Sequence, residues 1–228
     1  MQSNNRIRWW IPVLILVLVL AVVAMVLLLM PRDGPPPGEP TAPSETSPQL
    51  EALRCLQFSR YSGEYVEDGS HEQVSGVAAM LVTNPTDRFL DLATVTYAVG
   101  DTTATFKITG LPPGGTAWVL EENRLRLEDG WEFTYEDSTY TFRSDAIRQT
   151  DMLTVERDGE NLTVTNVSDD TLQNVCLYYK VKHSDGNYLG GITYMLDFGT
   201  LEPGGGATKQ SGHFGPEAEI VRYSYQTG

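Results

Sequence analysis

The residue types most often found in metal and catalytic sites are few and widely spaced in this chain of 228 residues. Its three histidines, His71, His183 and His213, do not form a short metal-binding spacing such as His-x-x-x-His. No Gly-x-Ser-x-Gly sequence and no Cys/His pattern indicates a nucleophile. The glycine run at 204–206 lacks the Lys-Ser/Thr pair of a phosphate-binding loop. The sequence therefore predicts no metal site, no cofactor and no catalytic residues, and we expect a protein that is not an enzyme.

Two pairs of adjacent acids, Asp169-Asp170 and Glu121-Glu122, are the other candidates for chemistry. A calcium loop needs alternating oxygen ligands over about a dozen residues, and neither pair lies in such a run. We therefore expect solvated acids at turns. A pair of carboxylates that hydrolyses glycosides stays open as an alternative, because such residues meet only in the folded chain.

The two cysteines, Cys55 and Cys176, are too few for a fold built on disulfides. Two independent thiols are the expected state, and a single bridge between domains in an oxidising exterior is the alternative. Trp118 and Trp131 are expected in the core or on a sheet face. Exposure of both on one face would instead indicate a binding patch.

The N-terminal part of the chain predicts a membrane anchor. Residues 9–30 contain 22 residues with no charge, and as a helix they would span about 33 Å, enough to cross a bilayer core of about 30 Å. Arg6 and Arg8 precede this segment, so the positive-inside rule places residues 1–8 in the cytoplasm and the rest outside. The alternative is a signal peptide cleaved after Val22-Val23-Ala24, but six more apolar residues follow that point.

The composition after the anchor predicts an acidic extracellular part on a spacer. Without Arg6 and Arg8, the chain has 14 basic and 30 acidic residues, which argues against binding to nucleic acid. Residues 31–48 contain seven prolines and no large apolar residue. This composition predicts an extended, semi-rigid linker that holds the following domains away from the bilayer.

Beyond residue 48, short runs rich in Val, Thr, Tyr and Phe alternate with turn signals such as the Asp-Gly pairs at 68–69, 129–130, 158–159 and 185–186. This pattern predicts strands throughout. Residues 125–142 are expected to form two strands, and the leucines at 50, 53 and 56 predict either one or two helical turns or an opening strand. The runs at 152–156 and 221–225 are expected to open and close a second domain.

An internal repeat divides this β-rich region. Thr83-Asn84-Pro85-Thr86-Asp87 aligns with Thr165-Asn166-Val167-Ser168-Asp169, 82 positions later. The apolar positions around it follow the same offset and alternate along each strand. The second copy then has an insertion of eight residues, after which the match resumes at an offset of 90, through Leu111-Pro112-Pro113-Gly114-Gly115 and Leu201-Glu202-Pro203-Gly204-Gly205. Such ordered matches indicate a duplication.

The repeat predicts an all-β ectodomain of two tandem Ig-like antiparallel β-sandwiches after one N-terminal transmembrane helix. The first sandwich is expected at 49–148 and the second at 149–228. In the second copy, Thr165-Asn166, Tyr178-Tyr179, Asp185-Gly186 and the Leu-x-Pro-Gly sequence at 201–204 resemble the FxLYD-type and related immunoglobulin-like repeats of bacterial surface proteins. The resemblance covers about 160–212, and more loosely 78–119, where the first copy lacks the longer central hairpin.

The resemblance implies an extracytoplasmic β-sandwich attached to a membrane anchor, and it implies no catalytic residues. We therefore expect a single-pass cell-membrane protein that contacts the lipid bilayer through residues 9–30. Its extracellular part would act as a structural or protein-interaction module of the cell envelope, with an envelope or membrane protein as partner. The alternative is a ligand-binding or accessory subunit of an envelope transporter or wall-building complex.

Overall fold

The computed structural model describes residues 52–70 and 72–228. The predicted cytoplasmic N-terminus (1–8), transmembrane helix (9–30) and linker (31–48) lie outside these residues, as does His71. Within 52–70 and 72–228, no helix is long and apolar enough to span a membrane.

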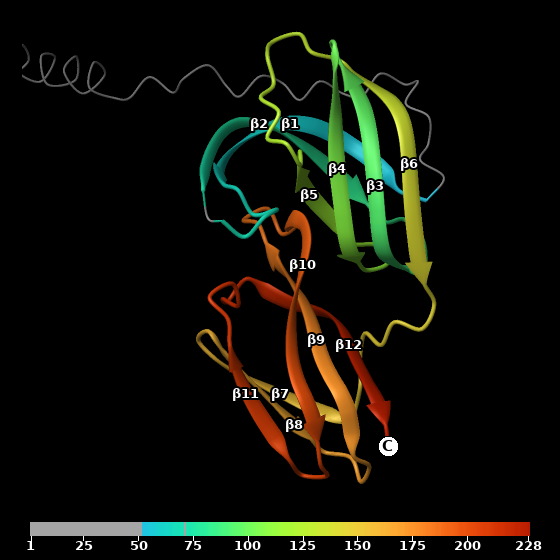
Figure 1. Ribbon diagram of the computed structural model, residues 1–228, viewed down its shortest axis with the longest axis vertical. Helices are drawn as coiled ribbons and strands as arrows, with labels where there is room; N and C mark the ends of the chain where they lie inside the picture. The colour runs from blue at the N-terminus through green and yellow to red at the C-terminus, as the bar shows by residue number, and fades with distance from the viewer. Residues whose placement is uncertain (1–51, 71) are drawn as a thin grey trace, which may run out of the picture. The chain divides into compact units, whose positions relative to one another are not determined.

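The described residues are all-β, as the sequence predicts (Figure 1). They form twelve strands: β1 (Arg54–Glu64), β2 (Gln73–Thr83), β3 (Phe89–Val99), β4 (Thr102–Leu111), β5 (Thr116–Leu120), β6 (Phe133–Arg143), β7 (Leu153–Asp158), β8 (Asn161–Asn166), β9 (Leu172–Lys182), β10 (Tyr188–Leu201), β11 (Gly206–Gln210) and β12 (Ala218–Thr227). We call β1–β6 the first half and β7–β12 the second half.

These strands form three sheets. Two have three strands each, in the orders β4-β3-β6 and β11-β8-β7, and the third has six, in the order β1-β2-β5-β10-β9-β12. One hydrophobic core is built mainly from β2, β3, β4 and β5, and another from β7 to β10. Each half thus places three strands of the shared sheet near a separate three-stranded sheet, an arrangement consistent with a β-sandwich.

The strand order and the register follow the predicted repeat. In the first half Tyr97 lies opposite Ala104, and in the second half Tyr179 lies opposite Tyr194, so the offsets of 82 and 90 both hold. The inward residues of β3 are buried, and so are nearly all of their counterparts on β9. The order β1-β2-β5 with β4-β3-β6 recurs as β7-β8-β11 with β10-β9-β12.

One buried asparagine in each half fixes the same corner of the chain. The Nδ2 of Asn84 donates to the carbonyls of Arg88 (2.8 Å) and Leu111 (3.1 Å), and its Oδ1 accepts from Thr86. The Nδ2 of Asn166 donates in the same way to Asp170 (2.7 Å) and Leu201 (3.0 Å), and its Oδ1 accepts from Ser168. The repeated Thr-Asn motif is therefore a structural corner, because the amide satisfies carbonyls of two chain segments that would otherwise be buried without partners.

Two details differ from the sequence expectation. Only one strand, β6, forms within 125–142, because residues 125–127 instead hydrogen bond to β2 as an irregular segment, through Ala78 N–H to the Leu125 carbonyl (2.8 Å) and Leu127 N–H to the Gly76 carbonyl (2.9 Å). The residues around Leu56 belong to strand β1, so the opening strand forms and the helical alternative is wrong for them.

Candidate functional site

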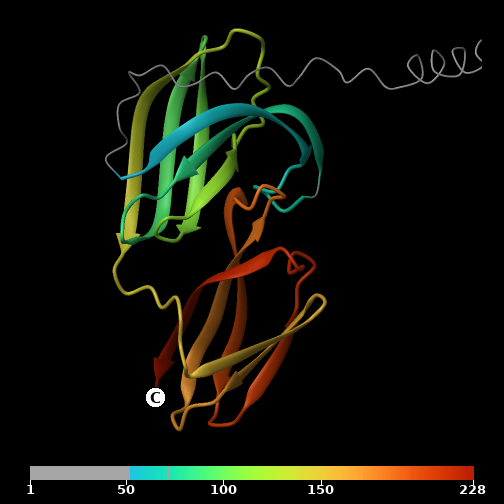
Figure 2. The same cartoon turned by 180° about the vertical axis from the view of Figure 1, so that it is seen from behind.

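The inserted residues of the second copy form the joint between the two halves. They lengthen the β9–β10 hairpin and extend β10 until it lies beside β5, with Tyr188 opposite Ala117 and Leu189 opposite Trp118 in a parallel pairing. Strand β10 therefore pairs with β9 on one side and with β5 on the other, as Figures 1 and 2 show. The first copy has only Gly100-Asp101 at this hairpin and makes no equivalent connection.

A fully buried lysine lies at the centre of the joint. Lys180 is on β9, on the face opposite the core of the second half, and its side chain is 0% exposed. Its Nζ donates to the carbonyl of Thr109 on β4 (3.1 Å) and to the carbonyls of Gly191 (3.2 Å) and Ile192 (2.6 Å) on β10. A weaker contact reaches Thr193 Oγ1 at 3.4 Å. Lys180 thus binds main-chain oxygens from both halves.

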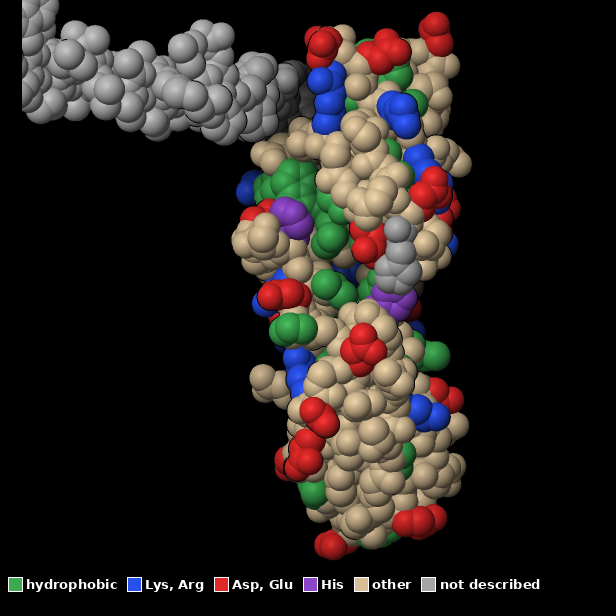
Figure 3. Space-filling model, turned by 90° about the vertical axis from the view of Figure 1, so that its left-hand side faces the viewer, with side chains coloured by type: hydrophobic (Ala, Val, Ile, Leu, Met, Phe, Trp, Pro, Cys, Tyr) green, Lys and Arg blue, Asp and Glu red, His purple; other side chains and the backbone are tan. Residues whose placement is uncertain are grey.

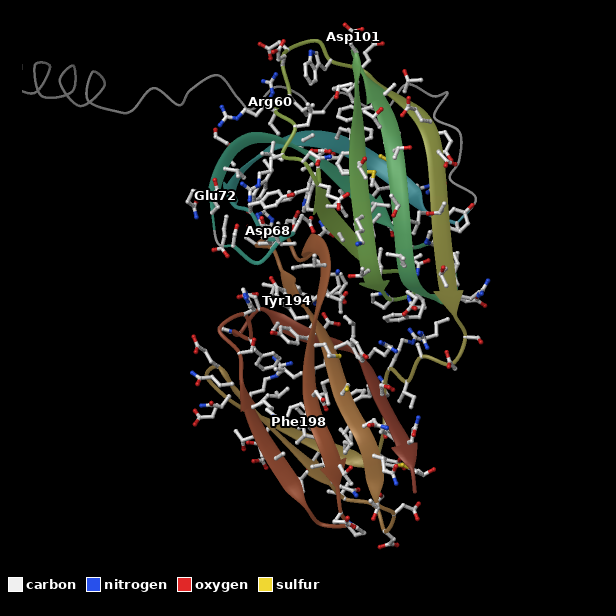
Figure 4. The ribbon with its side chains drawn as sticks, in the orientation of Figure 1. Arg60, Asp68, Glu72, Asp101, Tyr194 and Phe198 are labelled. Carbon is white, nitrogen blue, oxygen red and sulfur yellow. The ribbon has the colours of Figure 1, made fainter. Side chains whose placement is uncertain are left out.

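A carboxylate from the first half lies across the Gly191 backbone from this lysine. Glu67, in the loop between β1 and β2, accepts hydrogen bonds from Gly191 N–H (2.8 and 2.9 Å to its two oxygens) and from Leu120 N–H (2.7 Å). The Gly191 N–H thus points to the carboxylate while its carbonyl points to Lys180. The loop itself is held by Arg124, which pairs with Asp68 and Glu72, both labelled in Figure 4.

Burial shifts the protonation of both charged groups. It lowers the pKa of Lys180 to about 7, against the opposing effect of the Glu67 charge. Burial also raises the pKa of Glu67, although hydrogen bonds from Gly191 and Leu120 and the charge of Lys180 act in the other direction. Bulk water is not the main partner of either charged group. The charged form of each is therefore stabilised by the other charge and by the main-chain groups of the joint.

The close approach of the two halves requires glycine at two positions. A Cβ on Gly191 would lie 1.8 Å from the carbonyl oxygen of Lys107 on β4. Gly110, at the end of β4, has a φ of +58°, and a Cβ there would lie 2.4 Å from Thr193 Oγ1. Thr193 also donates to the Thr109 carbonyl (2.7 Å), and Thr109 donates to the Gly191 carbonyl (3.1 Å). The backbones of β4 and β10 therefore lie in close contact, and threonine side chains hold them there by donating to main-chain carbonyls.

The hairpin tip makes a further polar contact with the first half. Trp118 on β5 donates its Nε1–H to Asp185 (2.7 Å), which also accepts from the main-chain and side-chain nitrogens of Asn187 (3.0 Å each). Desolvation tends to raise the pKa of Asp185, but the hydrogen bonds from Trp118 and Asn187 outweigh it and lower the pKa to about 2. The Ser-Asp-Gly sequence thus forms the expected turn and also an anchor.

Apolar side chains complete the joint. Tyr188 and Val221 belong to the core of the first half although they come from β10 and β12, and Tyr178 packs against the same core. The guanidinium of Arg222 lies 3.7 Å from the ring centroid of Tyr178. The outer face of the β9–β12 pair is therefore covered where it meets the first half.

A groove of about 950 Å³ lies beside the joint. Its walls are the β4–β5 loop, the connection between β6 and β7, the tip of the β9–β10 hairpin and the first residues of β12; they comprise residues 112–116, 146–149, 182, 186–188 and 219–221. Lys182 and Glu219 form an ion pair across the wall (2.5 Å). The volume is in the range of small-molecule and peptide sites.

The histidines and acids that stand out in the sequence do not converge. His213 stacks on Tyr194, and His183 Nδ1 lies 3.3 Å from Asp185. Within 52–70 and 72–228, no group of three or more His, Cys, Asp or Glu side chains could hold a metal ion. Figure 3 shows acidic side chains spread over one face of the molecule.

The two acid pairs lie in different environments. Asp169 and Asp170 are exposed at the β8–β9 turn, as expected. The expectation of a solvated acid is wrong for Glu121, which is 0% exposed and accepts hydrogen bonds from the N–H groups of Thr105 (3.1 Å), Asn123 (2.8 Å) and Leu125 (2.8 Å). This carboxylate organises the chain after β5, because it supplies acceptors to three main-chain donors.

Both cysteines are free thiols, one in each half. Burial raises the pKa of Cys55 to about 11, and burial together with the nearby Asp197 raises that of Cys176. Thiols with raised pKa values are poor nucleophiles at neutral pH. Trp118 and Trp131 are both half-buried, Trp131 against the core of the first half and Trp118 against a small cluster on the outer side of β2 and β5.

No protein-family model matches the chain, and a comparison with the curated proteins finds no match either. The residues that build the joint, above all Glu67 and Lys180, were not among the sequence candidates. One signal for them was present: the eight-residue insertion follows Val181, one residue beyond Lys180, whose counterpart in the first copy is Ala98.

Proposed function

We propose that this chain is a single-pass protein of the cell envelope. Residues 9–30 would anchor it in the bilayer, residues 31–48 would act as a spacer, and the two halves would be tandem Ig-like sandwiches outside the membrane. In this role the two halves act as a structural or protein-interaction module. The FxLYD-like sequence of the second half supports the same assignment.

The observation that carries this proposal is the joint. A protein that presents binding surfaces at a fixed distance from a membrane needs adjoining domains that do not move freely. Here the sheet continues from one half to the other through β10, and a buried lysine hydrogen bonds to main-chain oxygens of both. Interfaces that are large and well packed hold domains in one arrangement, whereas small polar ones permit relative motion.

The topology can be tested on intact cells that express the full chain. A site for a sequence-specific protease would be inserted within 31–48, and a tag would follow Gly228. We expect external protease to release the tagged part, and the same site inserted within 1–8 to stay uncut. Protection of the site in 31–48 would contradict the proposal.

A second candidate function is that of a ligand-binding or accessory subunit of an envelope transporter or wall-building complex. The groove beside the joint favours it, because its lining contains the Lys182–Glu219 ion pair. Purification of the full chain in detergent separates the two candidates. A stoichiometric membrane-protein partner supports the accessory role, and its absence supports the independent module.

A further inference from the structure

We propose that the groove beside the joint binds an extended, acidic peptide segment of a partner protein, which adds a strand to the outer edge of β12. This inference deepens the proposed interaction role and rests on it, because it identifies the surface and the chemistry of the partner.

The first argument is the sheet edge. Strand β12 is the last strand of the six-stranded sheet, so β9 covers only one of its two edges. On the other edge, among the described residues, the one β-bridge joins Ile147 to Tyr223, with the Tyr223 N–H donating to the Ile147 carbonyl (2.7 Å). The chain itself thus shows that this edge accepts an extended segment. Glu219, Ile220 and Val221 precede this bridge and line the groove.

The second argument is the shape of the groove around that edge. The β4–β5 loop at 112–116 and the connection at 146–149 line the same groove as residues 219–221. A peptide that pairs with β12 in this groove would therefore contact both segments. Added strands gain affinity from main-chain hydrogen bonds and specificity from the side chains that meet the walls.

The third argument is charge. The chain carries a formal charge of −14, but the groove lining contains two basic side chains, Arg148 and Lys182, and one acidic side chain, Glu219. Glu219 is bound to Lys182, whereas Arg148 is exposed and has no ion pair within the described part of the chain. A carboxylate of a partner would supply that ion pair.

The hydrogen-bonding groups of the wall are also held in place before a ligand arrives. Lys182 is fixed by Glu219 at 2.5 Å, and it lies 6.0 Å from the ring centroid of Tyr188, which is 6% exposed. Such prior ordering reduces the entropy that a ligand must overcome on binding.

The test uses the full chain in detergent micelles and a fluorescent, capped heptapeptide of sequence Thr-Val-Glu-Val-Glu-Val-Thr. We expect saturable binding by fluorescence anisotropy, weakened at least about tenfold by Arg148→Glu and by replacement of both peptide glutamates with lysine. Arg126→Glu is the matched control, because Arg126 is equally exposed but lies outside the groove lining. It should leave the affinity unchanged.

Amide hydrogen exchange separates strand addition from a purely electrostatic contact. We expect the bound peptide to slow exchange at the N–H groups of 219–221 that face the outer edge of β12. Binding without this protection would overturn the proposal, as would equal binding to Arg148→Glu, or no binding at about 1 mM peptide, the weak end of specific affinities. These outcomes leave the protease test of the envelope location untouched, so the two proposals can fail separately.

Discussion

The two halves of the molecule share a framework and differ on one face of one strand. The inward residues of β3 and β9 correspond, and Asn84 and Asn166 make the same hydrogen bonds. On the opposite face, Thr94, Thr96 and Ala98 of β3 are replaced by Cys176, Tyr178 and Lys180 of β9. The second copy alone also carries the long hairpin. Residues that maintain the fold are therefore repeated, whereas those that build the joint occur in one copy.

The largest expected effect comes from the central lysine. Lys180→Met keeps an unbranched side chain of similar length but leaves three carbonyls without their donor and removes the positive charge that acts on Glu67, so the free energy of unfolding should fall by about 3–5 kcal/mol. The matched control is Ala98→Lys at the equivalent position of the first half, which should change it by less than about 1 kcal/mol. Urea unfolding followed by circular dichroism measures both. Equal losses of unfolding free energy in the two variants would show that the outward faces of β9 and β3 do not differ as described.

The repeated corner should behave in the opposite way, with equal effects in the two halves. Asn84→Ala and Asn166→Ala each remove two donors from buried carbonyls and an acceptor from a turn, so each should lower the free energy of unfolding by about 2–3 kcal/mol. Hydrogen exchange of β3 and β9 amides reports the two halves separately. A lower free energy of unfolding in only one of the two variants would show that the two corners are not equivalent.

The joint should also make stability depend on pH. In the unfolded chain the pKa of lysine is about 10.4, and burial lowers that of Lys180 to about 7. Between these two pKa values the unfolded chain binds more protons at Lys180 than the folded chain does. The free energy of unfolding therefore decreases as the pH falls and increases as the pH rises. From pH 7 to pH 8 the free energy of unfolding should therefore increase. Urea unfolding of Lys180→Met should lack this increase, and a persistent increase would assign it to another group.

The smallest expected effect lies at the hairpin tip. Asp185→Asn weakens the charged hydrogen bond to Trp118, and because the carboxylate is partly exposed the loss should be about 0.5–1 kcal/mol. Asp101→Asn, in the short turn of the first half, should have no measurable effect. Thermal unfolding compares the two variants, and an equal response would mean that the tip contact adds nothing.

Much of the fold could be predicted from the sequence because it depends on local patterns. Alternating apolar residues identify the strands and their inward faces, and the repeated Thr-Asn and Pro-Gly sequences set the alignment that the register confirms. The failures have a common cause. The segment at 125–127 hydrogen bonds to β2, and the acid at 121 accepts a hydrogen bond from Thr105 on β4, and no local pattern reveals either contact.

The joint could not be predicted from the sequence for the same reason. Glu67 precedes an Asp-Gly pair and looks like an ordinary turn acid, yet its partner Gly191 is 124 positions away. Lys180 lies between Tyr179 and Val181, on the face of the strand opposite the alternating apolar positions. Only the insertion after it distinguishes this lysine from a surface residue, and the insertion alone does not show which strand it meets.

The central claim is that the inserted hairpin residues join the halves into one body. Replacing residues 182–191 with Gly-Asp gives the second copy the hairpin of the first and removes both residues of β10 that pair with β5. Spin labels on Asp101→Cys and Lys209→Cys, in a background of Cys55→Ser and Cys176→Ser, report the distance between the halves by pulsed electron paramagnetic resonance. We predict one narrow distance distribution with the native hairpin and a broad one with the short hairpin. Distributions of equal width would contradict the account.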